Sequence, residues 1–194
     1  MIHTWFTSDH HFGHSNILEY EKYARPFSCL EEMHEALIDN WNSVVRDGDI
    51  VYHLGDFCFG RQNIEIAGRL NGKKRLIMGN HDSYPSSDYL RYFDKLYGAL
   101  FWKGCILTHV PVHPDQFGKR AALNLHGHLH SKKVKQIVNE LFQMKLNDDR
   151  CPVTFMKPGW EEEDLNYFNV SVEQNNLIPF HADQILERLE VLKI

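Results

Sequence analysis

Side chains able to bind metal ions recur in five short clusters along the first two thirds of the chain. Each cluster follows a run of residues typical of a β-strand. The clusters are Asp9-x-His11, Gly55-Asp56, Gly79-Asn80-His81-Asp82, His109 and His128-x-His130. Histidine is the commonest metal ligand in proteins, and it fills 13 of the 194 positions. Because ligands bind beyond the carboxyl ends of strands in α/β sheets, we expect the clusters to converge on one site.

The spacing within the clusters supports this expectation. Alternate residues of an extended chain point the same way, so Asp9 and His11 can face one ion, as can His128 and His130, while His10 points elsewhere. Glycines at positions 55, 79 and 127 leave room for the backbone to turn close to the ions. Imidazole, carboxylate and amide oxygen suit Mn²⁺, Fe²⁺ or Fe³⁺, Zn²⁺ or Ni²⁺.

The segments between the clusters predict an α/β fold, since strand patterns alternate with helix patterns. Strands are predicted by β-branched and aromatic residues, and helices by apolar residues at helical spacing. The predicted strands are residues 2–7, 50–54, 75–78, 123–125 and 167–172, with a hairpin of 98–102 and 105–108. The predicted helices are residues 28–45, 61–70, 87–97 and 182–192, the first of which opens on a capping box of Ser28 and Glu31.

One segment does not follow this alternation. Residues 131–166 combine Lys132, Lys133 and Lys135 with the acidic run Glu161-Glu162-Glu163-Asp164. A chain of this length corresponds to one domain of ordinary size. We therefore expect a single domain over residues 1–194, in which 131–166 is an insertion or a lid.

The composition excludes several classes of protein. Hydrophobic residues make up 43 % of the chain and charged residues 24 %, which is typical of a globular protein. No stretch approaches the roughly 18 apolar residues of a membrane span, and the first residues lack the features of a signal peptide. We therefore expect a cytoplasmic protein without a membrane partner. The net charge of −5 is unlike the basic balance of a duplex-binding protein.

The four cysteines form no CxxC motif and are expected to be reduced core thiols; they are Cys29, Cys58, Cys105 and Cys151.

Taken together and in order, the five clusters resemble the calcineurin-like metallophosphoesterase superfamily. The pattern of that superfamily is Asp-x-His, Gly-Asp, Gly-Asn-His-(Glu/Asp), His and Gly-His-x-His, and the match covers residues 4–130. The stretches SDHHFGHSNI and YHLGDF look like those of small single-domain phosphoesterases of bacteria and their phages. The resemblance implies two packed mixed β-sheets flanked by α-helices, a four-layer αββα sandwich.

The resemblance also implies two divalent metal ions as cofactors. One ion would be held by Asp9, His11, Asp56 and His130, and the other by Asp56, Asn80, His109 and His128, so that Asp56 bridges them. Two divalent ions carry more positive charge than the two carboxylates neutralise, so the site stays positive and attracts phosphate. A hydroxide shared between the ions would have its pKa lowered toward about 7, which makes it a nucleophile at neutral pH.

Further roles follow from the neighbours of these ligands. In the superfamily the histidine at the position of His81 is the general acid, and Asp82 could orient its ring. His14 is a candidate for binding substrate phosphate, with a polar role at a helix entry as the alternative. Arg61 is a second candidate for binding phosphate, with a surface role as the alternative.

The expected activity is hydrolysis of a small phosphate ester, either a phosphodiester or a nucleotide-type substrate. Protein phosphatases of the superfamily carry Gly-Asp-x-x-Asp-Arg-Gly, whereas Phe59 replaces the second aspartate here, which disfavours a Ser/Thr phosphatase and a double-strand-break nuclease. One alternative is a nuclease acting on single-stranded nucleic acid, contacted by Lys132, Lys133 and Lys135. Another is a non-catalytic interaction module, which would be expected to lack a ligand or the general acid.

Overall fold

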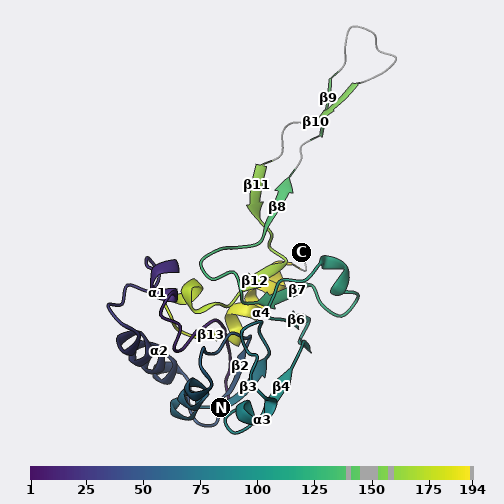
Figure 1. Ribbon diagram of the computed structural model, residues 1–194. Coiled ribbons are helices and arrows are strands. Elements are labelled where there is room, and N and C mark those ends of the chain that lie inside the picture. Colours follow the sequence, from purple (N-terminus) through teal and green to yellow (C-terminus); the bar gives the residue numbers. More distant parts are fainter. Residues whose placement is uncertain (139–140, 145–152, 157–159, 193–194) are drawn as a thin grey trace.

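Two mixed β-sheets form the centre of the computed structural model (Figure 1), which describes residues 1–138, 141–144, 153–156 and 160–192. The first sheet has the order β13-β1-β2-β3-β4, and the second has the order β12-β7-β6-β5. The first sheet is parallel apart from β13 and contains β1 (Thr4–Thr7), β2 (Ile50–His53), β3 (Lys73–Ile77), β4 (Lys95–Tyr97) and β13 (Phe180–His181). The second is parallel apart from β5 and contains β5 (Leu100–Trp102), β6 (Cys105–Leu107), β7 (Leu123–His126) and β12 (Tyr167–Asn169).

The alternation of side chains along the strands explains why the two sheets pack together. Successive residues of a strand face opposite sides of its sheet. Phe6 and Ile77 therefore face the second sheet, where they share a buried cluster with Leu107 and Leu125. Full burial of each such side chain contributes roughly 1.5–3 kcal/mol. The predicted fold class, two packed mixed sheets with flanking helices, is confirmed.

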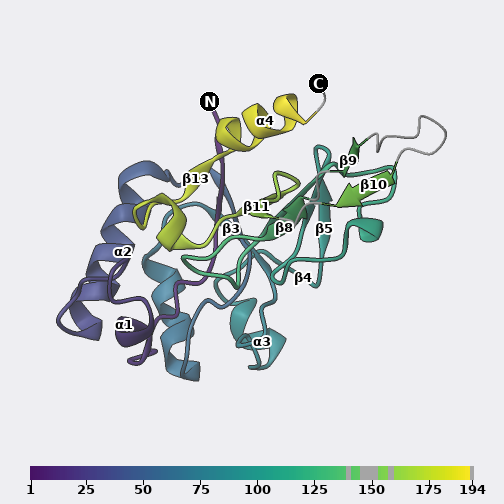
Figure 2. The same ribbon diagram turned by 90° about the horizontal axis from the view of Figure 1, so that it is seen from above.

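Helices cover the outer face of the first sheet. They are α1 (Ile17–Tyr20), α2 (Leu30–Val44), the 3₁₀ helix η1 (Arg61–Arg69) and α3 (Ser86–Tyr89). The helix α2 buries Met33, Leu37 and Trp41, which lie on one stripe because they are four residues apart. The last helix, α4 (Ala182–Val191), lies apart from α1, α2 and α3 (Figure 2) and buries Ile185 and Leu189 in the cluster between the sheets.

The outer face of the second sheet is covered mainly by a loop. Phe117 packs there against Ile106 and Tyr167, just after the short 3₁₀ helix η2 (Pro114–Gln116). A further 3₁₀ helix, η3 (Val172–Asn175), follows β12. The fourth layer of the sandwich therefore consists largely of loop on this side.

Several predicted elements are corrected by the structure. Residues 61–70 form a 3₁₀ helix, and the predicted helix 87–97 is wrong because the chain leaves helix after Tyr89 and residues 95–97 form β4. Without β4 the backbone of β3 would have no hydrogen-bond partner on its outer side, and the pairing of Leu76 with Leu96 satisfies it. The capping box is also wrong, because the N–H and Oγ of Ser28 donate to Glu32.

The segment 131–166 forms strand pairs outside both sheets. β8 (Lys135–Val138) pairs antiparallel with β11 (Trp160–Glu163), and β9 (Leu141–Met144) pairs with β10 (Val153–Met156). These pairs point away from the two sheets (Figure 1). Their position outside the sheets accords with an insertion, and the role of a lid stays a prediction.

The cysteines match their expected environment only in part. Cys58 and Cys105 are buried free thiols, whereas Cys29 is exposed at the start of α2, and Cys151 lies outside the described residues. Within the part of the chain that the structure describes, we find no helix both long enough and apolar enough to cross a bilayer.

Candidate metal centre

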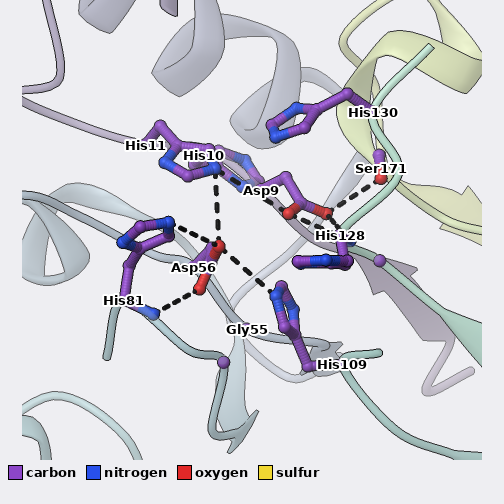
Figure 3. A network of polar contacts seen from close by, with 12 residues as sticks. Asp9, His10, His11, Gly55, Asp56, His81, His109, His128, His130 and Ser171 are labelled. Carbon is purple, nitrogen blue, oxygen red and sulfur yellow. Dashed lines mark hydrogen bonds and ion pairs between the residues drawn. The ribbon is translucent and has the colours of Figure 1, made fainter. Parts of the chain in front are cut away.

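The five clusters gather at the carboxyl ends of β1, β2, β3, β6 and β7 (Figure 3). Backbone hydrogen bonds hold the connecting loops side by side. The N–H of Asp9 donates to the carbonyl of Gly55 at 2.9 Å, and that of His11 donates to the carbonyl of Asp56 at 3.1 Å. In the second sheet the N–H of Gly127 donates to the carbonyl of His109 at 2.9 Å. The N–H of His128 donates to Oδ2 of Asp9 at 3.0 Å, so residues 119 positions apart in sequence share one site.

Two groups of potential ligands stand next to each other. One contains Asp9, His11 and His130, the other contains Asp56, His109 and His128, and the ligand atoms of each group lie within 4.8 Å of one another. Asp56 stands between the groups, because its Oδ2 is 3.6 Å from Nε2 of His11 and 3.3 Å from Nε2 of His109. The Oδ1 of Asn80 lies 2.9 Å from the same His109 nitrogen. The structure therefore brings together all seven residues proposed as metal ligands.

His11 provides the test of whether these residues fit metal ions. Both of its ring nitrogens are buried and have no hydrogen-bond partner. Its Nε2 is 3.8 Å from Oδ1 of Asp9 and 3.6 Å from Oδ2 of Asp56, which is too long for hydrogen bonds. A buried polar atom without a partner is costly. A divalent ion bound at about 2.0–2.2 Å would give a partner to Nε2 of His11, Oδ1 of Asp9 and Oδ2 of Asp56.

The backbone is strained at the same residues. Asp9, His11, Asp56, His128 and His130 have φ angles between 50° and 68°, a region that residues other than glycine seldom adopt. Glycines permit this close packing. A Cβ on Gly79 would lie 2.3 Å from Oδ1 of Asp56, and one on Gly127 would lie 2.4 Å from Oδ2 of Asp9.

The surroundings of Asp9 and Asp56 favour the ionised form of both carboxylates. Burial alone would raise the pKa of Asp9, but the nearby imidazoles of His11, His109 and His130 lower that pKa well below its usual value. Asp9 also accepts hydrogen bonds from the N–H of His128 at 3.0 Å and from Oγ of Ser171 at 2.8 Å. The pKa of Asp56 is likewise lowered, since His109 outweighs the effect of burial. Ionised carboxylates are the form that binds a metal ion.

The pKa of His109 is shifted in the opposite direction, upward. Burial would lower its pKa, but the hydrogen bond to Asp56 and the charges of Asp9 and Asp56 raise it to about 9 in the metal-free protein. Its Nδ1 donates to the carbonyl of Leu54 at 2.7 Å. Its Nε2 therefore faces Asp56 and Asn80.

His81 stands at the accessible rim of the centre. Its Nε2 lies 3.8 Å from Oδ2 of Asp56, its backbone N–H donates to Oδ1 of Asp56 at 2.9 Å, and 43 % of its side chain is exposed. The ring lies 4.6 Å from the ring of Phe59.

The role predicted for Asp82 needs correction. Its buried carboxylate accepts hydrogen bonds from the backbone N–H groups of Asp56, Phe57 and Gly79, at 2.8, 3.0 and 2.9 Å. With its oxygens engaged in this way, Asp82 holds two ligand-bearing loops together and does not orient the ring of His81.

The two candidates for substrate binding differ in their positions. The ring of His14 stacks on Phe59 at 4.0 Å and lies 5.5 Å from the ring of His11, so His14 remains a candidate beside the centre. Arg61 forms two hydrogen bonds to Asp88, at 2.7 and 2.8 Å, on a surface groove that it shares with Arg91 and Tyr92. Its guanidinium is paired with Asp88 there, which accords with the surface role, and the phosphate-binding role of Arg61 stays a prediction.

Three residues of the site were missed by the sequence analysis: Arg25, Ser171 and Glu173. Ser171 binds Asp9, Glu173 accepts a hydrogen bond from His130, and Arg25 pairs with Glu173. Nothing in their spacing links them to the clusters, because their partners lie far away in the chain. His10, in contrast, lies off the metal centre as expected, and shares a buried hydrogen bond with His53 at 2.9 Å.

Comparison with known proteins defines the class to which this fold and site belong. A model of the calcineurin-like phosphoesterase family matches residues 2–186. The chain belongs to that family, whose members are metal-dependent phosphoesterases, and the predicted resemblance is confirmed.

The relatives themselves carry little functional description. An uncharacterized protein of Methanocaldococcus jannaschii is 33 % identical over 194 residues, which cover 98 % of this chain and 93 % of that protein. The Gene 66 protein of Mycobacterium phage L5 is 40 % identical over 116 residues, which cover 57 % of this chain and 52 % of that protein. A solved structure of a protein of unknown function from Aquifex aeolicus is 25 % identical, with a TM-score of 0.67 over 96 % of this chain and 99 % of that one.

Proposed function

We propose that this protein hydrolyses a small phosphate ester, a phosphodiester or a nucleotide-type substrate, with two divalent metal ions bound. The observation that carries the proposal is the pair of His and Asp groups that meet at Asp56, with the exposed imidazole of His81 beside them. Asp9, His11, Asp56 and His130 would hold one ion, and Asp56, Asn80, His109 and His128 would hold the other.

Metal ions and protein side chains have separate tasks in this proposal. When bound, two divalent ions supply positive charge to a phosphoryl group and activate water as a nucleophile. Asp82 keeps the loops that carry Asp56 and Asn80 in register through its three backbone hydrogen bonds. Asp9 is fixed by Ser171 and by the backbone of His128, so its oxygens are oriented before a ligand binds.

His81 acts as the general acid. Its backbone is fastened to Asp56, but no hydrogen bond restrains its ring among the described contacts, and the ring is open to solvent. From this position it can give a proton to the leaving oxygen, which departs as an alcohol, and can recover a proton from water. A group of this kind contributes typically 10²–10⁴-fold to a rate.

The proposal is tested with two generic esters. Protein stripped of metal and reloaded with Mn²⁺ should hydrolyse bis(p-nitrophenyl) phosphate or p-nitrophenyl phosphate, and faster turnover of the diester would support a phosphodiester substrate. The metal-free protein is the control. Metal-loaded, folded protein that hydrolyses neither ester would overturn the proposed activity.

Two of the three lysines considered for a nuclease are already paired. Lys133 binds Glu163 at 2.8 Å and Lys135 binds Glu161 at 2.9 Å. These ion pairs favour a small substrate over a single-stranded nucleic acid. Tight binding of an oligonucleotide that weakens steeply with added salt would reverse that preference. The non-catalytic alternative is disfavoured because the chain keeps both His81 and the full set of candidate ligands.

A further inference from the structure

A buried ion pair lies behind one of the two groups of candidate metal ligands. Arg25, just after α1, and Glu173, in η3, are 148 positions apart. The Oε1 of Glu173 accepts from Nη2 of Arg25 at 2.6 Å and from Nε at 2.8 Å. Both side chains are fully excluded from solvent. Removing one partner of such a pair leaves an uncompensated buried charge, so the two residues act as a unit.

This pair contacts the metal centre at both of its ends. Oε1 of Glu173 accepts a hydrogen bond from Nδ1 of His130 at 3.0 Å. The guanidinium of Arg25 donates to the carbonyl of His10 at 2.9 Å and also to the carbonyl of Asp9. The loop after β1 and the loop after β7 are therefore tied to the same ion pair, and these loops carry Asp9, His11 and His130.

The hydrogen bond from His130 to Glu173 has a defined chemical effect. An imidazole that donates its Nδ1 proton to a carboxylate has an unprotonated Nε2, a fixed ring orientation and greater basicity as a ligand. The second group of ligands lacks this arrangement within the described residues, since Nδ1 of His109 donates to the uncharged carbonyl of Leu54. The two candidate ion sites thus differ in their supporting contacts.

We propose that the Arg25–Glu173 pair is a positioning device for His130, which selectively strengthens binding of the ion held by Asp9, His11 and His130. The inference rests on the proposed function for the existence of two bound ions. Glu173 and Arg25 are positioning residues in this scheme, because they act through His130 and the loop after β1.

Binding of Mn²⁺ by Glu173→Ala and Glu173→Gln tests the inference without any assay of activity. Calorimetry and metal analysis should show two ions in the wild-type protein. In Glu173→Ala one ion should bind about 10–100-fold more weakly, the usual cost of losing such a partner, while the other binds unchanged. Glu173→Gln keeps an acceptor for His130 and should lose less. In the Zn²⁺-loaded wild type, nitrogen NMR should show a protonated Nδ1 on His130, and this signal should change in Glu173→Ala.

Asp49→Asn is the matched control. Asp49 is another carboxylate with little exposed surface; it accepts hydrogen bonds from the N–H of His3 at 2.8 Å and from Nε1 of Trp5 at 3.1 Å, and none of its described partners is a candidate ligand. Its substitution should lower the melting temperature and leave both ions bound. Two outcomes would overturn this inference and leave the proposed function standing: folded Glu173 variants that bind both ions as the wild type does, or variants that lose both ions equally. A wild-type protein that binds no pair of ions would overturn the proposed function as well.

Discussion

At the scale of single residues, His81 belongs to neither group of candidate ligands although it lies beside Asp56. His81→Ala should therefore keep both metal ions while kcat falls by about 10²–10⁴-fold, the usual loss for a general acid. Metal analysis and steady-state kinetics on one preparation check this. A variant that lost its ions would show that His81 is a ligand and that its assigned role is wrong.

Asp56 should behave in the opposite way. Because its Oδ2 lies within 4 Å of ligand atoms from both groups, Asp56→Asn removes charge from both ion sites at once. Metal affinity and activity should be lost together. The control is Asp88→Asn, which removes a carboxylate that pairs with Arg61 away from the centre and should leave metal content unchanged. Retention of two tightly bound ions by Asp56→Asn would contradict a bridging position.

The pKa of His109 predicts a pH dependence of metal binding. In the metal-free protein Asp56 and Asp9 raise this pKa to about 9, so His109 is protonated at pH 7. A histidine must be neutral to bind a metal ion. Binding should therefore release a proton, and affinity should rise with pH up to about 9, by roughly tenfold per pH unit for one proton. Calorimetry at pH 7 in buffers of different ionisation enthalpy measures the release, and heats that do not depend on the buffer would contradict it.

The sequence analysis identified residues whose side chains themselves suit metal binding, and missed those that act through hydrogen bonds. Asp9, Asp56 and His109 stand out because each follows a strand and carries a ligand atom. Glu173 and Arg25 could not be recognised in this way, since their contacts depend on how distant segments pack. Asp82 shows the same limit: its position was noted, but its partners are backbone amides, which no residue type reveals.

At the scale of elements, the predictions succeeded where one apolar pattern extends over a whole element, as in the strands after residue 50 and residue 105 and in the helix α2. Residues 50–54 and 105–108 were placed correctly because β-branched and apolar residues run together there. The segment 87–97 was predicted as a helix because Leu90, Phe93 and Leu96–Tyr97 follow helical spacing, but Leu90 is exposed in the structure. Lys95–Tyr97 is a strand because it pairs with β3, a tertiary contact that the local sequence does not reveal.

The close contact between the loops after β1 and β7 gives a prediction at this scale. A Cβ on Gly127 would lie 2.4 Å from Oδ2 of Asp9 and 2.5 Å from Oγ of Ser8. Gly127→Ala should force Asp9 to move, which would weaken metal binding and destabilise the fold by about 1–3 kcal/mol, the usual cost of overpacking. Calorimetric metal titration and thermal unfolding measure the two effects. Gly98→Ala is the control, because nothing lies within 4 Å of a Cβ there, and an equal effect in that variant would contradict the argument.

At the scale of the whole molecule, the strand pairs of 131–166 belong to neither of the two sheets and contact the body at their base, where Glu163 lies 3.7 Å from Arg188 of α4. The described clusters of buried apolar residues come from the two sheets, the helices and the loops that cover them. The metal centre likewise draws every candidate ligand from loops at the ends of sheet strands. The folding of the body and the assembly of the centre should therefore not depend on the projecting pairs.

Removal of the projecting pairs tests this independence and the predicted lid together. Lys135 and Glu163 face each other in the β8–β11 ladder, so residues 136–162 can be replaced by Asn-Gly, a two-residue hairpin turn. The shortened protein should keep its melting temperature, both ions and its turnover of p-nitrophenyl esters, because none of these uses the removed strands. If the segment is a lid, KM should rise for a dinucleotide while it stays constant for the smaller ester. Loss of folding or of metal binding would show instead that the segment is part of the domain core.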